Sequence, residues 1–354
     1  MAIEDKIWTP KKAKINFEEK EKMVVINPSK KVHKLDSGVI FDKADLLNKR
    51  LHHLTRNTAI SYSLAGIIGV GKSTIPKIMR FYMEAEEYNE ETNNLPLQLL
   101  YHDMPTYSFP FQFYVGERRW ALNHAAKRDL NSKISDRSPY EDLLFTLNFV
   151  EMKAMSFAQY ESVKEMLKQK IVDNGTPDVL MWLQAKPETA YKRIQSRGIE
   201  YEAKGKERLL TKNEKKEIQK IREYFVELVE KYAPSELKEY KAKQKKAGIP
   251  KIMMAGGVSL DYLKSLDRRY DADFEGVLKM MNFDGVLLKL NVDDDIRGTD
   301  KRVNFNDQVK MMEQIKDASL FSLYRKGYSI EECGGKIKLL SPFDNKKPYM
   351  KKKI

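Results

Sequence analysis

The sequence predicts an α/β fold in which a doubly wound parallel sheet of about five strands carries helices on both faces. A short, β-prone segment at residues 60–65 ends at a glycine and is followed by a helical stretch. Compact apolar segments at 133–136, 179–185 and 286–292 alternate with long helical stretches, which is typical of a parallel sheet. We expect helices over residues 73–87, 111–130, 140–172 and 187–197. Ligand groups should then gather at the carboxyl ends of the strands.

Residues 203–256 depart from this alternation. Apolar side chains recur there at three- and four-residue spacing from Ile218 to Tyr232, which predicts an amphipathic helix. Pro234 ends this helix, and a second charged helix is expected over residues 235–246. The segment is therefore predicted to be a helical hairpin inserted in the core domain.

The length of 354 residues, 42% of them hydrophobic, is enough for one enzyme-sized core, residues 36–320. We interpret residues 1–35 as a basic arm and residues 321–354 as a basic tail. The net charge of +13 lies in the appendages, because 203–256 carries 15 Lys and Arg against 8 Asp and Glu, and 336–354 carries 7 Lys against one Asp. Such segments are usually solvated, and a nucleic-acid partner is the less favoured interpretation.

Composition also excludes several classes of protein. A single cysteine, Cys333, rules out an internal disulfide framework, and five scattered histidines show no metal-ligand spacing. No apolar run approaches the ~20 residues that span a bilayer, and the first residues lack the apolar stretch of a secretion signal. We therefore expect a cytoplasmic protein with no membrane partner.

The glycine-rich loop GIIGVGKS fits the Walker pattern of a P-loop kinase fold. Its glycines let successive N–H groups surround an anion, and the following helix adds the positive end of its dipole. Lys72 can reach the outer phosphates of ATP, and the Ser73 hydroxyl can ligate Mg²⁺. The residues expected to contact the nucleotide phosphates are Gly66, Ile67, Ile68, Gly69, Val70, Gly71, Lys72, Ser73 and Thr74.

The acceptor has to be inferred from other segments. Tyr101, Phe111 and Gln112 precede or begin a helix, and aromatic rings beside an amide suit a flat base, although ordinary core packing explains them equally well in isolation. At the end of the strand 133–136, Asp136 and Arg137 are well placed for Mg²⁺ and for charge on a transferring phosphoryl group.

Two further arginines, Arg193 and Arg197, lie four residues apart on one face of the helix expected over 187–197. On one face of the helix, both guanidinium groups could bind the same phosphate groups. The alternative interpretation is that they belong to a solvated basic face of the helix.

In this order the segments resemble the deoxynucleoside kinases, in the branch that contains deoxycytidine, deoxyguanosine and deoxyadenosine kinases. The resemblance covers roughly 200 residues between Ala59 and about Leu320, and leaves out the arm, the hairpin and the tail. Its motifs besides the P-loop are LQLLYHD and YSFPFQ within 97–112, DRS at 136–138, LQAKPETAYKRIQSRG at 183–198, GGVSLDYLKSL at 256–266 and KLNVDDD at 289–295.

The resemblance implies transfer of the γ-phosphoryl group of ATP, or another nucleoside triphosphate, to the 5′-hydroxyl of a deoxynucleoside in nucleotide salvage. Deoxycytidine or a deoxypurine is favoured over thymidine, and a homodimer is expected. Gln112 would read the base with Arg119 and Asp142, while Tyr101 and Glu202 would hold the 3′-hydroxyl. The implied acceptor residues are Tyr101, Phe111, Gln112, Arg119, Arg137, Asp142, Phe145 and Glu202. The implied catalytic and donor residues are Lys72, Asp136, Arg137, Arg193 and Arg197, with Ser73 and Asp136 for Mg²⁺ and Asp294, Asp295 and Ile296 near the adenine.

At two points the sequence departs from the family pattern. The family's general base is a glutamate at the end of the second strand; among Glu87, Glu90 and Glu91 we choose Glu90, with Glu91 next, because the base-binding block follows directly. Ile199 stands where the family usually has another lid arginine, a contact that Lys206 or Arg208 could replace.

Two other functions remain as alternatives. A nucleoside monophosphate kinase of the thymidylate kinase type shares the P-loop and the Asp-Arg pair, but the acidic stretch 84–96 lacks its additional arginine. A non-catalytic P-loop scaffold that binds nucleic acid through the basic appendages would not need the catalytic charges.

Overall fold

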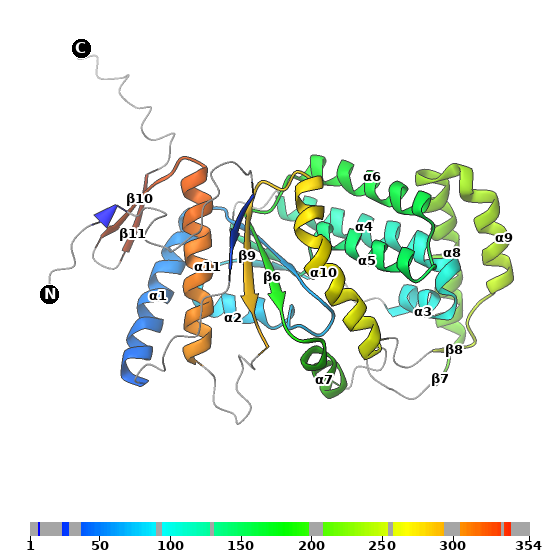
Figure 1. Ribbon diagram of the computed structural model, residues 1–354, viewed down its shortest axis with the longest axis horizontal. Coiled ribbons are helices and arrows are strands. Elements are labelled where there is room, and N and C mark those ends of the chain that lie inside the picture. The colour runs from blue at the N-terminus through cyan, green and yellow to red at the C-terminus, as the bar shows by residue number, and fades with distance from the viewer. Residues whose placement is uncertain are drawn as a thin grey trace, which may run out of the picture.

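A six-stranded parallel sheet forms the centre of the computed structural model (Figure 1). The structure describes residues 6–7, 23–27, 37–89, 94–127, 131–197, 208–253, 258–293, 305–333 and 336–340. The strand order is β2-β9-β6-β3-β5-β4, and every neighbouring pair is parallel. The strands are β2 (Val24–Ile26), β3 (Ser61–Ala65), β4 (Glu86–Tyr88), β5 (Lys133–Ser135), β6 (Val179–Gln184) and β9 (Val286–Asn291). The predicted doubly wound α/β fold is confirmed.

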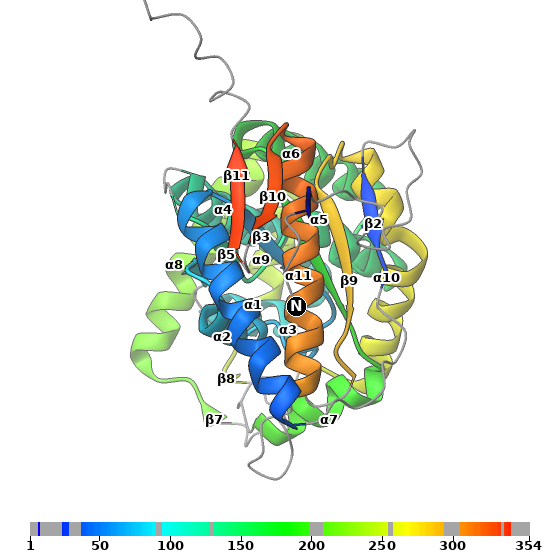
Figure 2. The same ribbon diagram turned by 90° about the vertical axis from the view of Figure 1, so that its left-hand side faces the viewer.

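Helices cover both faces of this sheet, as Figure 2 shows from the side of α1 and α11. One layer contains α1 (Ser37–Asn57), α2 (Ile75–Tyr82) and α11 (Phe305–Arg325). The opposite layer contains α4 (Met104–Lys127), α5 (Pro139–Glu151), α6 (Phe157–Asn174) and α10 (Leu260–Met280), with α3 (Asn94–His102) packed on α4. The helix α7 (Pro187–Arg197) has the bounds that the sequence predicts. No helix in the described part of the chain is long and apolar enough to cross a membrane.

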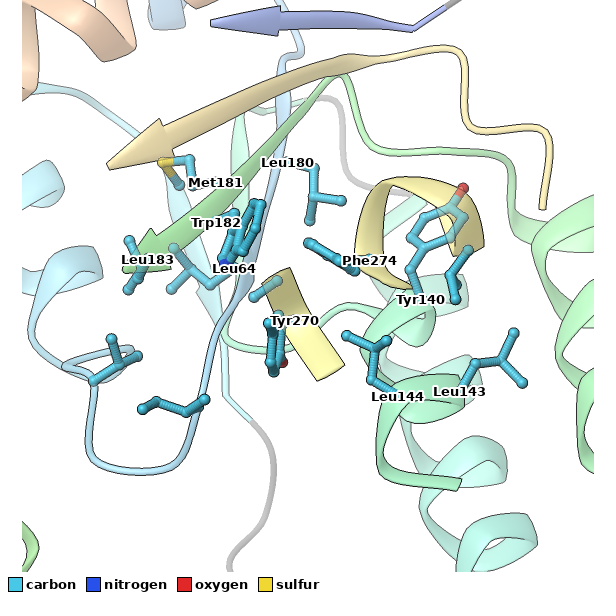
Figure 3. Close-up of a cluster of buried hydrophobic side chains, with 14 of the residues drawn as sticks. Leu64, Tyr140, Leu143, Leu144, Leu180, Met181, Trp182, Leu183, Tyr270 and Phe274 are labelled. Carbon is cyan, nitrogen blue, oxygen red and sulfur yellow. The ribbon is translucent and has the colours of Figure 1, made fainter. Parts of the chain in front are cut away.

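The core between the sheet and α10 is aromatic (Figure 3). Trp182 of β6 stacks on Tyr270 with ring centroids 6.1 Å apart, and meets Phe274 edge-on at 5.4 Å. Offset and edge-to-face pairs of this kind add roughly 0.5–1.5 kcal/mol each beyond their buried area. This packing fixes Tyr270, whose hydroxyl reaches the P-loop as described below.

Several boundaries differ from those expected. The helix expected over 73–87 ends at Tyr82, because the chain becomes extended at Met83 and pairs as β4. The helix expected over 140–172 is two helices, since Lys153 has a positive φ of 56° and Ser156 begins α6 with a capping box.

The terminal segments are more structured than an arm and a tail. Val24–Ile26 pairs with β9 as the sixth strand of the sheet. Beyond α11, which runs past residue 320, β10 (Ser329–Cys333) and β11 (Lys336–Leu340) form a second, antiparallel sheet with β1 (Lys6–Ile7). The boundary predicted at 320/321 therefore falls inside a helix.

The predicted insertion is a helical hairpin at the far end of the molecule from α1 (Figure 1). It comprises β7 (Arg208–Leu209), α8 (Lys212–Tyr232), a 3₁₀ turn (Pro234–Glu236), α9 (Leu237–Ala247) and β8 (Ile252–Met253), which pairs with β7. Thr211 and Glu214 begin α8 with a capping box. The apolar stripe of α8 packs on α4, where Phe225 meets Tyr107 and Tyr114.

We expect Phe225→Ala to lower the free energy of unfolding by about 3–5 kcal/mol, because a fully buried aromatic side chain would leave a cavity against α4. Lys220→Ala, on the exposed side of α8, should change it by less than ~0.5 kcal/mol. Urea unfolding followed by circular dichroism measures both. Equal midpoints for the two variants would show that the hairpin does not contribute to the core.

Candidate active site

The P-loop connects the end of β3 to the beginning of α2. Gly66 and Gly69 both have positive φ, 143° and 80°. A Cβ atom on Gly66 would lie 2.6 Å from the carbonyl oxygen of Leu183, and one on Gly69 would lie 2.6 Å from that of Ala190. Both positions therefore require glycine, because the loop packs directly on the backbone at the end of β6 and on α7.

The ammonium group of Lys72 is buried beneath this loop. It donates to the carbonyl of Gly66 and to that of Ile67, the latter at 3.1 Å. Burial, and then the positive charge of Arg137, lower the pKa of Lys72 to about 8, although the negative charge of Glu141 opposes both effects. The group is thus still charged at neutral pH, but only by a small margin.

A buried carboxylate, Glu141, lies at the centre of the site, and the sequence analysis did not identify it. Its Oε2 accepts from the N–H of Gly66 at 3.2 Å and from the hydroxyl of Tyr270 at 2.7 Å. Its Oε1 accepts from Arg137 at 3.1 Å. Burial by itself would raise the pKa of Glu141, but Lys72, Arg137 and the other donors lower it below its ordinary value. Glu141 is therefore an anion that joins the P-loop to the end of β5.

The residues predicted to read a base lie together on α4 and α5. Arg119 and Asp142 form a buried ion pair. Gln112 is 2% exposed and lies seven residues before Arg119, on the same side of α4. The Oε1 atom of Gln112 and the Oδ2 atom of Asp142 are buried without a hydrogen-bond partner among the residues that the structure describes. Each of these two acceptor atoms therefore has room for a donor that the described residues do not supply.

Asp136 and Arg137 follow β5, at the carboxyl edge of the sheet. The N–H of Asp136 donates to the carbonyl of Tyr88, which joins this turn to β4. The guanidinium of Arg137 lies 5.9 Å from the centre of the Phe145 ring and also pairs with Glu141. The structure thus brings together the predicted residues of the donor and acceptor sides at one edge.

Of the two predicted lid arginines, Arg193 is described in full. Its guanidinium donates to main-chain carbonyls of Val70 at 3.0 Å, Val292 at 2.7 Å and Asp293 at 3.1 Å. It therefore joins the P-loop to the end of β9, and its role at the ATP phosphates stays a prediction. Arg197 is the last residue of α7, and its side chain is outside the described part.

Comparison with known proteins gives the family. A profile of the deoxynucleoside kinase family matches residues 62–253, which is more than half of the chain. The chain belongs to the deoxynucleoside kinase family. A deoxyadenosine kinase of Lactobacillus acidophilus is 27% identical over 210 residues, covering 58% of this chain and 88% of the relative. A deoxyadenosine/deoxycytidine kinase of Bacillus subtilis is 30% identical over 155 residues, covering 43% and 70%.

A deoxyadenosine kinase from M. mycoides with bound dCTP aligns with a TM-score of 0.46 at 15% identity, over 72% of this chain and 98% of that one. The expectation of an ATP-dependent phosphotransferase with a deoxynucleoside acceptor is confirmed by the family.

In this deoxynucleoside kinase, Glu87 faces away from the acceptor residues. It pairs in register with Ile134, which pairs with Tyr62, and Tyr62 bonds to Ser319 of α11. Because side chains alternate along a strand, Glu87 belongs to the α2 and α11 face, where it lies 3.6 Å from Arg80. It acts there as a counter-ion of α2.

Other predicted site residues have a different status. Arg208 is bound by Glu214 at 2.7 and 3.0 Å within the hairpin. Tyr101 lies in α3, half-buried. The residues outside the described part of the chain are Glu90, Glu91, Ile199, Glu202, Lys206, Asp294, Asp295 and Ile296.

We expect ATP binding to be accompanied by proton uptake at alkaline pH. With its pKa at about 8, Lys72 is mostly neutral at pH 8.5, and phosphate oxygens beside it favour the charged form. About 0.7 proton should therefore be taken up at pH 8.5 and about 0.1 at pH 7. Titration calorimetry in buffers of different ionisation enthalpy measures this number. Lys72→Arg, which stays charged, should show no such uptake; equal uptake in both proteins would contradict the assignment.

Glu141→Gln should lower the free energy of unfolding by about 3–5 kcal/mol at pH 7, because it leaves buried cations without their counter-ion. The pKa of Glu141 is lowered in the folded state, so its contribution is present above pH ~4.5 and is lost as the pH falls below that value. The difference between wild type and variant should accordingly shrink under acid.

Tyr270→Phe is the matched control, since it keeps the carboxylate and removes one donor. A loss of about 1–3 kcal/mol is expected. Urea unfolding at several pH values measures all three proteins. If the difference in unfolding free energy between the wild type and Glu141→Gln is the same at pH 7 and at pH 3.5, Glu141 is not ionised in the folded protein.

Proposed function

We propose that this kinase prefers a deoxynucleoside whose base carries an amino group, deoxycytidine or a deoxypurine, over thymidine. The observation that carries the proposal is the pair of buried acceptor atoms, Gln112 Oε1 and Asp142 Oδ2, without partners in the described structure. An exocyclic amino group donates two hydrogen bonds, whereas the corresponding thymine oxygen only accepts. The relatives act, by name, on deoxyadenosine, deoxyguanosine or deoxycytidine, which agrees with this preference.

Charge neutralisation accounts for the phosphoryl-transfer side of the proposal. Lys72 and Arg137 lie at the carboxyl edge of the sheet on either side of Glu141, and Arg193 and Arg197 are proposed to complete the set from α7. Positive groups already fixed in place stabilise the charge that spreads over the transferring phosphoryl oxygens. Because Lys72 is held by loop carbonyls, it must exchange these for phosphate oxygens when ATP binds.

The residues present also fit a magnesium ion. The Oδ1 atom of Asp136 is buried with no hydrogen-bond partner among the described residues, and the Ser73 side chain is exposed at the beginning of the P-loop helix. Mg²⁺ prefers hard oxygen ligands and typically takes one or two from the protein and the rest from phosphates and water. We propose Ser73 and Asp136 as these ligands; when bound, the ion would supply positive charge that neutralises the phosphate oxygens.

For the general base we propose Glu90, with Glu91 as the alternative. The orientation of Glu87 toward α2 argues against that residue. Tyr88 is bonded to Asp136 at the carboxyl edge, and Glu90 follows it by only two residues, or at most about 7 Å of extended chain. We therefore propose that this carboxylate takes the proton of an acceptor hydroxyl bound at the carboxyl edge.

A substrate panel tests the base preference. With Mg²⁺ and ATP, kcat/KM for deoxyadenosine, deoxyguanosine or deoxycytidine should exceed that for thymidine by about 100-fold, because two unmatched buried acceptors cost roughly 2–3 kcal/mol together. Lys72→Ala is the inactive control. Equal use of thymidine would refute the proposed preference, and phosphorylation of the monophosphates alone would refute the acceptor class.

Substitution of the three glutamates tests the general base. Glu90→Gln should lower kcat by about 10²- to 10⁴-fold, the usual contribution of a positioned base. Glu87→Gln, the matched control on β4, should change kcat less than ~3-fold because its carboxylate pairs with Arg80. If only Glu91→Gln is inactive, Glu91 is the general base. If only Glu87→Gln is inactive, Glu87 does not point away from the acceptor residues as we infer from the strand register.

A further inference from the structure

A cavity of about 250 Å³ lies at the amino edge of the sheet, the edge opposite the P-loop. Its floor is formed by the beginnings of β3 and β5, and its walls by α4 and the second half of α6. The acceptor residues Gln112 and Arg119 are not among the residues that line it. It is therefore separate from the active site described above.

Two polar atoms of this cavity lack a partner. The indole Nε1–H of Trp120 is a buried donor and the Oδ1 atom of Asn174 is a buried acceptor, each with no hydrogen bond to the described residues. The side chain of Asn174 lies beside the main chain of Trp120, because its amide donates to the carbonyl of Trp120 at 3.2 Å. An unmatched buried polar atom costs about 1–3 kcal/mol, so an unmatched donor and an unmatched acceptor on residues that line one cavity indicate a partner that offers both.

Two of the three lysines that line the cavity are in ion pairs. Lys326 pairs with Asp178 at 2.5 Å, and Lys170 pairs with Glu117 at 3.3 Å. Asp178 also accepts from the N–H and the hydroxyl of Ser61. A charged ligand would have to break these pairs, whereas a neutral one would not.

The remaining lining suits a flat ring. The sides of Leu167 and Ile171 are apolar, and serines and Asn123 supply further hydrogen-bonding groups. The volume is below the ~300 Å³ at which sites for drug-sized ligands begin. The size and the paired donor and acceptor fit a single nucleobase, either free or as part of a nucleoside whose sugar extends toward the half-exposed Lys326.

We propose that this cavity is a second ligand site, for a neutral nucleobase, distinct from the acceptor site. It is coupled to catalysis through Ser135, which donates to Asn123 at 3.3 Å. These two residues line both this cavity and a small one of about 10 Å³ that is also lined by Arg119 and Arg137. A base bound beside Asn123 would therefore lie next to a cavity that two arginines of the active site also line.

The indole N–H of Trp120 is a direct probe of occupancy. The chain has three tryptophans, so the ¹⁵N-labelled protein has three indole signals, and Trp120→Phe identifies the relevant one. Adenine, cytosine and deoxyadenosine are titrated in turn to about 5 mM, which fills more than three-quarters of a site with a Kd of ~1 mM. Each titration is done twice, once with the acceptor site empty and once with it saturated by the best substrate of the panel.

The expected result is a saturable shift of the Trp120 signal by the free bases; a response to deoxyadenosine as well would show that the sugar is tolerated. Asn174→Leu should abolish the shift, whereas Asn174→Asp, which keeps an acceptor oxygen, should retain it. Val172→Ala, on the exposed side of α6, is the matched control and should respond as wild type does.

No shift up to 5 mM, or a shift that persists in Asn174→Leu, would overturn the proposal and leave a cavity filled with water. A shift seen only when the acceptor site is empty, and lost in Gln112→Leu, would assign the binding to the acceptor site instead. The readout needs no turnover, so it can fail while the proposed kinase activity holds, and the reverse.

Discussion

The buried carboxylate of Glu141 is the interaction on which the active site depends. It is the point where the P-loop, α10 and the turn after β5 meet, through Gly66, Tyr270 and Arg137. A lone buried charge would cost many kcal/mol, but here it accepts three hydrogen bonds and lies near the ammonium of Lys72. Because the anion holds all these donors at once, the catalytic edge is arranged before any nucleotide binds, which is what electrostatic catalysis of phosphoryl transfer requires.

Because side chains alternate along each strand, the two faces of the sheet carry different groups. Tyr62 and Glu87 point to the α2 and α11 layer and are used for packing and for a counter-ion. Ser63 and Ser135 point to the α4 layer, where they bond to Arg137 and to Asn123. On β3 and β5, one face is thus part of a structural core, and the other presents Ser63 and Ser135 between the catalytic edge and the cavity at the opposite edge.

Local signals in the sequence predicted the features that depend on neighbours in the chain: the P-loop, α7 within its bounds, and the hairpin with its 3.6-residue stripe. Glu141 could not be predicted in this way, because an acidic residue in the first turn of a helix normally favours the helix dipole and solvent; its burial comes from Tyr270, 129 residues away. The strand β4 was missed because its three residues, EEY, are acidic and continue a helical pattern. Only pairing with β5 makes them a strand.

The hairpin belongs to the acceptor half of the enzyme, although it contributes no described atom to the chemistry. Its Lys231 and Tyr232 both bond to Glu117 of α4, two residues before Arg119, and Tyr232 stacks on Phe113, the residue after Gln112. Because α4 also carries Gln112 and Arg119, the residues proposed to recognise the base, a change in the hairpin would reach them through the position of this helix. The hairpin would thereby affect base recognition by supporting α4 and not by contacting the substrate.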